Sequence, residues 1–162
     1  QDGAEPNPNS VAVCNLLRLS NIFVDHSLQD KAVKILSLYS HRMTILPLAL
    51  PEMLCGLMFY SSNLKQVIVT GNRDCEDTQN LLKQVHQHFL PFKVLLLANK
   101  DSKDLLSERL KALEQLNGSE LSDSVAFVCQ KNSCSLPVFS PKELEKLLLG
   151  SLQQSVCEAH AA

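Results

Sequence analysis

Apolar residues in the first third of the chain recur at three- and four-residue intervals, which is the spacing of an amphipathic helix. Asn9 and Ser10 are N-cap residue types ahead of one such run, which extends to about Phe23. Ser27 can cap a second run, whose apolar face consists of Leu28, Ala32, Ile35, Leu36 and Tyr39. Pro51 suits the first turn of a third helix, which ends near residues 61–63. Residues 1–62 are therefore expected to form a block of helices.

The pattern changes after residue 64 to short apolar runs separated by helical stripes. Residues 66–70 and 94–98 have the composition of buried strands, and the second run is apolar throughout, which is typical of a central strand in a parallel sheet. The helix between them is expected to have Asp74 as its N-cap and to continue through Phe89 until Pro91. A further helix is expected after Asp101 or Ser102, with an apolar face at Leu106, Leu110 and Leu113.

A third strand is expected at residues 124–129, and a last helix follows it. Ser140, Pro141 and Glu143 stand in the order of an N-cap, a first helical residue and a capping-box residue. The order β-α-β-α-β-α predicts a small, three-stranded, mostly parallel sheet over residues 63–150. The fold class is thus α/β with a helical N-terminal block. Residues 151–162 lack a pattern and are expected to form a frayed tail.

Charge and hydropathy exclude two classes of partner. Fifteen Lys and Arg residues against 17 Asp and Glu residues give a formal net charge of −2, so there is no basic field for nucleic acid or an anionic membrane. The longest apolar runs, residues 44–50 and 94–98, are far shorter than the roughly 20 residues of a membrane-spanning helix. The chain begins at Gln1 without an initiator Met or a signal-peptide pattern, and we expect further polypeptide upstream.

Two of the six cysteines, Cys14 and Cys55, lie within apolar helical patterns and are expected to be buried free thiols. Cys129 and Cys134 form a C-x4-C pair at the end of the third strand. Structural thiols are the favoured interpretation of this pair, with a disulfide or redox pair and metal ligands as alternatives. Because no second close Cys or His pair completes a zinc site, we predict no metal ion, and no motif predicts a cofactor.

The candidates for acid–base catalysis are Asp2 and Glu5, since hydrolysis of sugars requires two carboxyl groups. A polar loop ahead of a helix is the favoured alternative. Gly71 follows the first strand, where a doubly wound fold binds phosphate, but the glycine set of a nucleotide site is absent and Asp74 places negative charge there. An ordinary helix start is therefore expected at this loop, and the fragment is not expected to be an enzyme.

Four stretches together resemble a known family: residues 2–11, 51–55, 89–94 and 126–138. They resemble the C-terminal end of a widespread family similar to the bacterial YyaL proteins, and the resemblance extends to about Gly150. It implies an upstream thioredoxin-like domain followed by an (α/α)6 barrel similar to six-hairpin glycosidases and sugar 2-epimerases. Residues 1–62 would be the last helices of this incomplete toroid, with Asp2 and Glu5 in a loop at the barrel mouth.

Members of this family are associated with spermatogenesis and with fertility or redox regulation, and some are described as secreted. The resemblance therefore implies a non-catalytic C-terminal fragment whose partners are the missing barrel and thioredoxin-like domains of its own chain. The alternatives are a fragment of a sugar-processing enzyme, epimerase-like or glycosidase-like with a carbohydrate ligand, and a redox element that uses Cys129 and Cys134. The cysteine usage fits an intracellular compartment as well as a secreted one, so the sequence assigns no location.

Overall fold

The computed structural model describes residues 1–98, 124–130 and 133–150. The chain divides into two compact units, residues 1–64 and residues 65–162, and each is described by itself. The expected helix after Asp101 or Ser102 and the expected tail at residues 151–162 lie outside the described residues. None of the helices in the described ranges combines the length and the apolar character that crossing a membrane requires.

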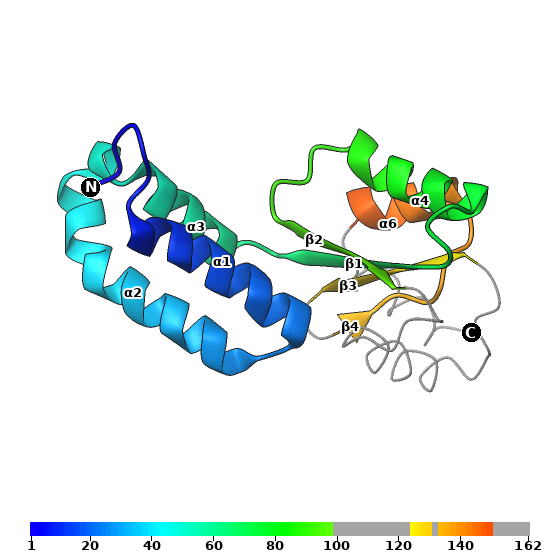
Figure 1. The fold of residues 1–162 in the computed structure, drawn as a ribbon, viewed down its shortest axis with the longest axis horizontal. Helices are drawn as coiled ribbons and strands as arrows, with labels where there is room; N and C mark the ends of the chain where they lie inside the picture. Colours follow the sequence, from blue (N-terminus) through cyan, green and yellow to red (C-terminus); the bar gives the residue numbers. More distant parts are fainter. Residues whose placement is uncertain (99–123, 131–132, 151–162) are drawn as a thin grey trace. The chain divides into compact units, whose positions relative to one another are not determined.

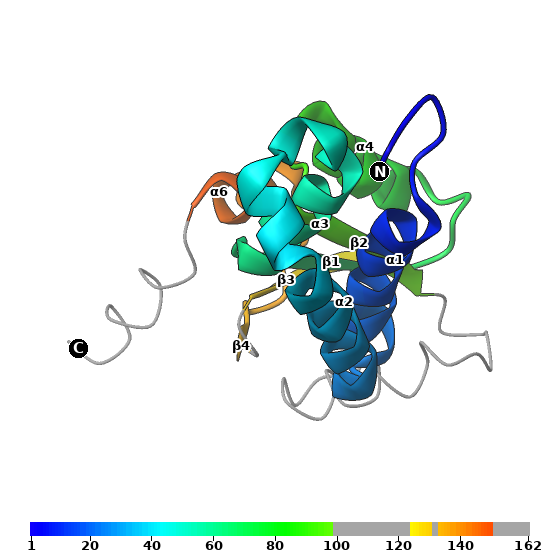
Figure 2. The same ribbon diagram turned by 90° about the vertical axis from the view of Figure 1, so that its left-hand side faces the viewer.

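The first unit is helical, as its periodicity predicts. It contains α1 (Pro8–Phe23), α2 (His26–Ile45), the short 3-10 helix η1 (Pro47–Ala49) and α3 (Pro51–Ser61). Helix α1 packs against both α2 and α3, and α1 and α2 lie side by side in Figures 1 and 2. The core side chains are Val13, Leu17, Ala32, Leu36, Met43, Leu50, Met53 and Phe59.

Close packing of α1 on α3 depends on a glycine. A Cβ atom at Gly56 would lie only 2.7 Å from Cγ1 of Val13, so a larger residue would push the two helices apart. One turn farther along, the Arg18 guanidinium lies 5.4 Å from the centre of the Phe59 ring, a cation–π contact between the same helices.

The first two helices begin earlier than expected. Asn7, rather than Asn9 or Ser10, caps α1, and its side chain accepts a hydrogen bond from the Asn9 amide. The reason is Pro8, whose fixed φ suits the first helical position and whose missing N–H needs no partner. Asp25, rather than Ser27, caps α2, because its carboxylate accepts the Ser27 amide at 2.8 Å.

The second unit contains a four-stranded mixed sheet, so the predicted three-stranded, mostly parallel sheet with residues 94–98 at its centre is wrong in strand number, strand direction and strand order. The described strands are β1 (Lys65–Thr70), β2 (Lys93–Ala98), β3 (Val125–Gln130) and β4 (Ser133–Cys134), in the order β2-β1-β3-β4. β1 and β2 are parallel, but β1 pairs with β3 and β3 with β4 in antiparallel fashion, so the sheet is not mostly parallel. Among the described strands β2 lies at an edge, whereas β1 and β3 are central.

Helices α4 (Glu76–Gln87) and α6 (Pro141–Leu149) pack on one another and lie over the same face of this sheet (Figure 1). The core between the helices and the sheet consists of Val67, Val69, Leu81, Val85, Ala126, Val128, Leu144 and Leu148. Strand residues that alternate with these, such as Ile68 and Phe127, are buried as well. Both faces of β1 and β3 are thus buried, although Gln66 and Thr70 place polar groups on one face of β1.

The helices of this unit confirm one predicted start and correct the other. The Ser140 hydroxyl accepts the Glu143 amide at 3.3 Å, and Pro141 takes the first position of α6, as expected. Helix α4, however, has Cys75 at its N-cap instead of Asp74, and no side chain caps it. It also ends at Gln87, so Phe89 lies outside the helix and is 92% exposed instead of joining the apolar stripe.

Candidate functional site

Asp2 joins the start of the chain to the N-terminus of α3. Its Oδ1 accepts the Asn7 amide at 2.8 Å, and its Oδ2 accepts the amides of Glu52 at 2.9 Å and Met53 at 3.3 Å. The Asp2 amide donates to the Ala49 carbonyl at 2.8 Å, which fixes the backbone of the same residue. A carboxylate at this position satisfies free amides of the first helical turn and interacts favourably with the helix dipole.

These contacts determine the protonation of Asp2. Desolvation alone would raise its pKa, but hydrogen bonds from the backbone amides of Asn7, Met53 and Glu52 outweigh desolvation and hold the pKa below the ordinary aspartate value. An ionised, fully engaged carboxylate is a poor general acid. Glu5, the other candidate carboxylate, is exposed. The geometry therefore favours a capping role for Asp2 over a catalytic one.

Cys129 and Cys134 lie opposite each other in the antiparallel pairing of β3 and β4. The structure joins them in a disulfide with an S–S distance of 2.03 Å and a Cα–Cα distance of 3.9 Å. A disulfide is one of the alternatives that the C-x4-C spacing leaves open. The two residues differ in environment, because Cys129 is buried in the sheet whereas Cys134 is exposed.

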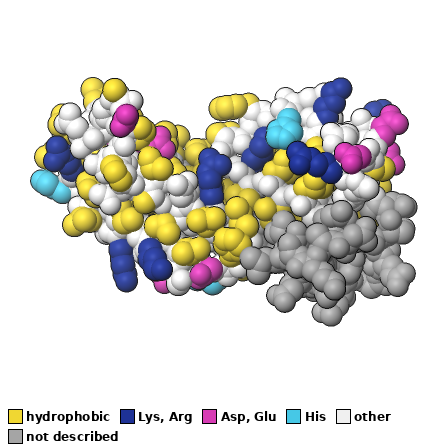
Figure 3. All heavy atoms as spheres, in the orientation of Figure 1, with side chains coloured by type: hydrophobic (Ala, Val, Ile, Leu, Met, Phe, Trp, Pro, Cys, Tyr) yellow, Lys and Arg dark blue, Asp and Glu magenta, His cyan; other side chains and the backbone are white. Residues whose placement is uncertain are grey.

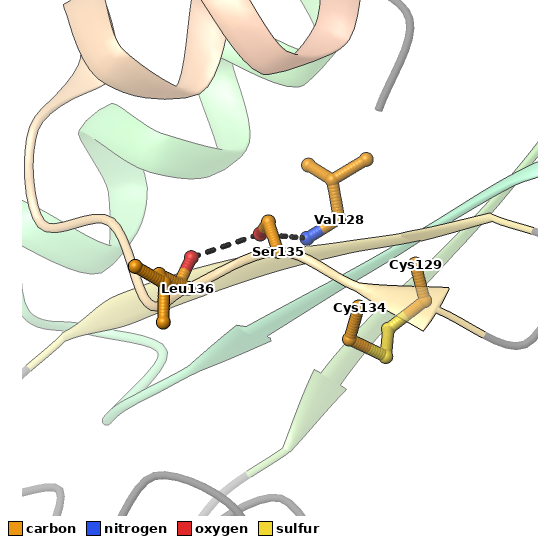
Figure 4. Close-up of a disulfide and its surroundings, with 5 residues drawn as sticks. All are labelled: Val128, Cys129, Cys134, Ser135 and Leu136. Carbon is orange, nitrogen blue, oxygen red and sulfur yellow. Dashed lines mark hydrogen bonds between the residues drawn. A yellow bond between two sulfur atoms is a disulfide. The ribbon is translucent and has the colours of Figure 1, made fainter. Parts of the chain in front are cut away.

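Hydrogen bonds, in addition to the disulfide, hold residues 135–138 against β3. The Ser135 amide donates to the Val128 carbonyl at 2.9 Å, and the Ser135 hydroxyl accepts the Val128 amide at 3.1 Å (Figure 4). Ala126 and Val138 exchange two backbone hydrogen bonds farther along, each 2.9 Å long. The sequence gives no signal for the role of Ser135 beyond its position directly after Cys134.

The loop after β1 closes tightly around Gly71. This glycine has a φ of 134°, and a Cβ atom there would lie 2.5 Å from Oγ1 of Thr78 and 2.8 Å from Oγ of Ser124. The two hydroxyls are buried and hydrogen-bonded to each other at 2.6 Å. Asn72 accepts the Asp74 amide at 3.0 Å, so side-chain hydrogen bonds organise the turn from within. These contacts agree with an ordinary helix start at this loop.

The cysteines of the first unit are not the buried pair that the apolar pattern predicts. Cys14 is half-buried and Cys55 is exposed. Burial, together with a hydrogen bond to Glu52 at 3.5 Å, raises the pKa of the Cys14 thiol to about 11. Cys14 is therefore protonated at neutral pH and a poor nucleophile.

Lys65 is a structural residue that the sequence does not reveal. Its ammonium group donates to the carbonyls of Leu147, Leu148 and Gly150 at 3.2, 2.5 and 2.7 Å, so it caps the C-terminus of α6 from 82 to 85 residues away. Desolvation lowers its pKa.

A second contact of this unit links the end of α4 to α6. Nε2 of His88, the residue that follows α4, lies 3.3 Å from Oε1 of Glu145 in α6. Within the described part of the chain, no group of three or more His, Cys, Asp or Glu side chains could hold a metal ion.

Comparison with known proteins gives one clear relationship. Residues of this chain are 43% identical to human spermatogenesis-associated protein 20 over 148 residues, and 40% identical to the mouse protein of that name over the same length. An uncharacterised protein of Caenorhabditis elegans is 28% identical over 148 residues. Each match covers 91% of this chain but only about a fifth of the relative, 19% for the human and mouse proteins and 20% for the nematode one.

No protein-family model matches the chain, and no solved structure matches it significantly. An identity of 43% over nearly the whole chain nevertheless establishes common descent. The chain is therefore a homologue of part of spermatogenesis-associated protein 20.

Proposed function

We propose that this chain is the non-catalytic C-terminal part of a larger protein like spermatogenesis-associated protein 20. On this proposal an upstream thioredoxin-like domain precedes an (α/α)6 barrel, residues 1–62 complete that barrel, and residues 63–150 form an accessory unit. The role of the whole protein in spermatogenesis, fertility or redox regulation belongs to the same proposal. The observation that carries it is the number of large apolar side chains left exposed on the first unit.

The exposed apolar residues of the first unit are numerous for a unit of 64 residues. They are Val11, Leu19, Phe23, Val24, Leu38, Ile45, Leu46, Leu48, Met58 and Tyr60. Figure 3 shows apolar side chains spread over the surface of the helical part. Isolated exposed apolar residues are common in soluble proteins, but extended groups of them mark surfaces that bind another element.

Exposed apolar side chains are clearest on α2 and on η1, which follows it. The buried face of α2 contains Ala32, Leu36 and Met43, whereas Leu38 and Ile45, seven residues apart, share the opposite face. Leu38 is 80% exposed, and Leu48 in the following η1 is 92% exposed. Two exposed apolar side chains therefore lie opposite the buried face of α2, on a side that also contains Lys34 and His41.

We take the missing neighbour to be an upstream helix of the same polypeptide. The matched relatives are about five times as long as the segment that they share with this chain, so the remaining length is ample for ten or so further helices. In an (α/α)6 barrel every hairpin packs between two others, so terminal hairpins taken alone expose one flank. The exposed face of α2 has the character of such a flank.

The test compares two substitutions in the full-length protein. Leu38→Lys places a charge in the proposed contact and is expected to lower the melting temperature by several degrees or to render the protein insoluble, because burying an unpaired charge is costly. Ser37→Lys, at the neighbouring exposed position, is the matched control and is expected to be tolerated. Equal tolerance of both substitutions in the full-length protein would contradict the proposal.

A further inference from the structure

We propose that the Cys129–Cys134 disulfide is a thiol-exchange site, in which Cys134 accepts the attack of a thiol compound and Cys129 is the resolving thiol. This inference is independent of the barrel proposed above. It rests on the unequal exposure of the two cysteines and on the hydrogen bonds that keep them opposed.

Exposure determines which sulfur can be attacked. Cys129 belongs to the central strand β3 and is 7% exposed, whereas Cys134 belongs to β4, a two-residue strand at the edge of the described sheet, both of whose residues are exposed. Thiol–disulfide exchange requires a thiolate to reach a disulfide sulfur, so accessibility directs the attack to Cys134.

The hydrogen bonds of residues 135–138 to β3 hold the two cysteines opposite each other when the S–S bond opens. The Ser135 amide donates a hydrogen bond to the Val128 carbonyl, and the Ser135 hydroxyl accepts one from the Val128 amide, the second of which is drawn in Figure 4. Val138 pairs with Ala126, and none of these hydrogen bonds involves the disulfide. Only four residues separate the two cysteines in sequence. After reduction, therefore, Cys129 and Cys134 remain opposed, and the disulfide can form again without refolding of the strand.

The exchange proceeds in two balanced steps. A thiolate attacks Sγ of Cys134, a new S–S bond forms between them, and the Cys129–Cys134 bond breaks with its electron pair on Cys129, which takes a proton from water. A second thiol then attacks the mixed disulfide and releases Cys134, so two thiols are oxidised to one disulfide while the cysteine pair gains two electrons and two protons. Alternatively, Cys129 attacks the mixed disulfide and restores the original bond, which makes it the resolving group.

The central experiment traps each half of the pair with oxidised glutathione. Cys129→Ser leaves the exposed Cys134 without its resolving partner, and we expect a stable mixed disulfide at Cys134, located by peptide mass spectrometry. Cys134→Ser is the matched control, because it leaves only the buried Cys129, which should react at least tenfold more slowly. Wild-type protein exposed to reduced glutathione should accumulate little adduct, since Cys129 removes it.

A measurement on the unmodified protein guards against variants that fail to fold. Dithiothreitol should reduce the pair in the native protein, with circular dichroism unchanged. Equal trapping of the two single-cysteine variants would overturn the proposal. So would a disulfide that dithiothreitol reduces only after urea is added, which is the behaviour of a purely structural bond, or a pair found reduced in protein purified without reductant.

Discussion

Replacing Gly71 with alanine should destabilise the second unit severely, because this residue combines an unusual backbone conformation with a tightly filled surrounding. Its φ of 134° lies in a region that residues with a Cβ atom rarely adopt. The added methyl group would also lie 2.5 Å from the Thr78 hydroxyl and 3.3 Å from the Cα atom of Ser124. The loop therefore cannot relieve both strains by a side-chain rotation.

The magnitude follows from two contributions. A non-glycine residue held in such a backbone region costs about 1–3 kcal/mol. Separating the buried Thr78–Ser124 hydroxyl pair, now 2.6 Å apart, costs about 1–3 kcal/mol more if the hydroxyls are left unsatisfied. The expected loss of about 2–6 kcal/mol is a large fraction of the roughly 5–15 kcal/mol that stabilises a typical domain.

The assay must report the second unit alone. Both tyrosines, Tyr39 and Tyr60, belong to the first unit and there is no tryptophan, so intrinsic fluorescence reports the first unit. Hydrogen exchange followed by mass spectrometry at β1 and β3 reports the second. Gly3→Ala is the control and should change stability by less than about 0.5 kcal/mol, because its Cβ atom would meet only the Glu5 carbonyl oxygen at 3.9 Å.

A second variant separates the two contributions. In a background of Thr78→Ala and Ser124→Ala, Gly71→Ala should retain the backbone cost and the contact with the Cα atom of residue 124 but not the cost of separating the hydroxyl pair, so the substitutions should be non-additive. The reasoning would be refuted if Gly71→Ala in the wild-type background accelerated exchange at β1 and β3 no more than Gly3→Ala does.

Two further predictions concern side chains that cap helices. The lowered pKa of Asp2 means that its ionised form stabilises the first unit above the ordinary aspartate pKa, 3.8, and that this stability is lost as the pH falls through the lowered pKa. Urea unfolding monitored by tyrosine fluorescence should therefore lose more stability on acidification in the wild type than in Asp2→Asn; identical acid sensitivity would exclude the capping role. Lys65→Met should cost about 1.5–3 kcal/mol, because it removes three charge-assisted hydrogen bonds from the end of α6. Faster hydrogen exchange within α6 would show this effect, whereas exchange equal to that of the exposed control Lys142→Met would argue against it.

Most of the helices and strands could be predicted from the sequence because the residues that determine them lie within or next to each element. Proline at the first turn of α3 and the Ser140–Pro141 start of α6 act within one helical turn, and the apolar runs of β1 and β3 record burial on both faces. Strand direction has no such local signal. A strand buried on both faces has the same composition whether its neighbour is parallel or antiparallel, so the reversed direction of β3 could not be read from its residues.

Two capping interactions that the sequence does not reveal join distant residues. Asp2 accepts amides of α3 about 50 residues away, and Lys65 reaches carbonyls more than 80 residues away. Neither residue stands beside the helix end that it caps, so a search for cap residues next to each helical run cannot find them. The same holds for the Thr78–Ser124 pair, which brings together two elements 46 residues apart.

The hydrogen bond of 2.7 Å from Lys65 to Gly150 joins the first residue of the second unit to the residue that follows α6. The two ends of the segment 65–150 therefore lie close together. A unit with adjoining termini can be grafted between two neighbouring positions of a host chain, or circularly permuted, with little loop-closure entropy to overcome.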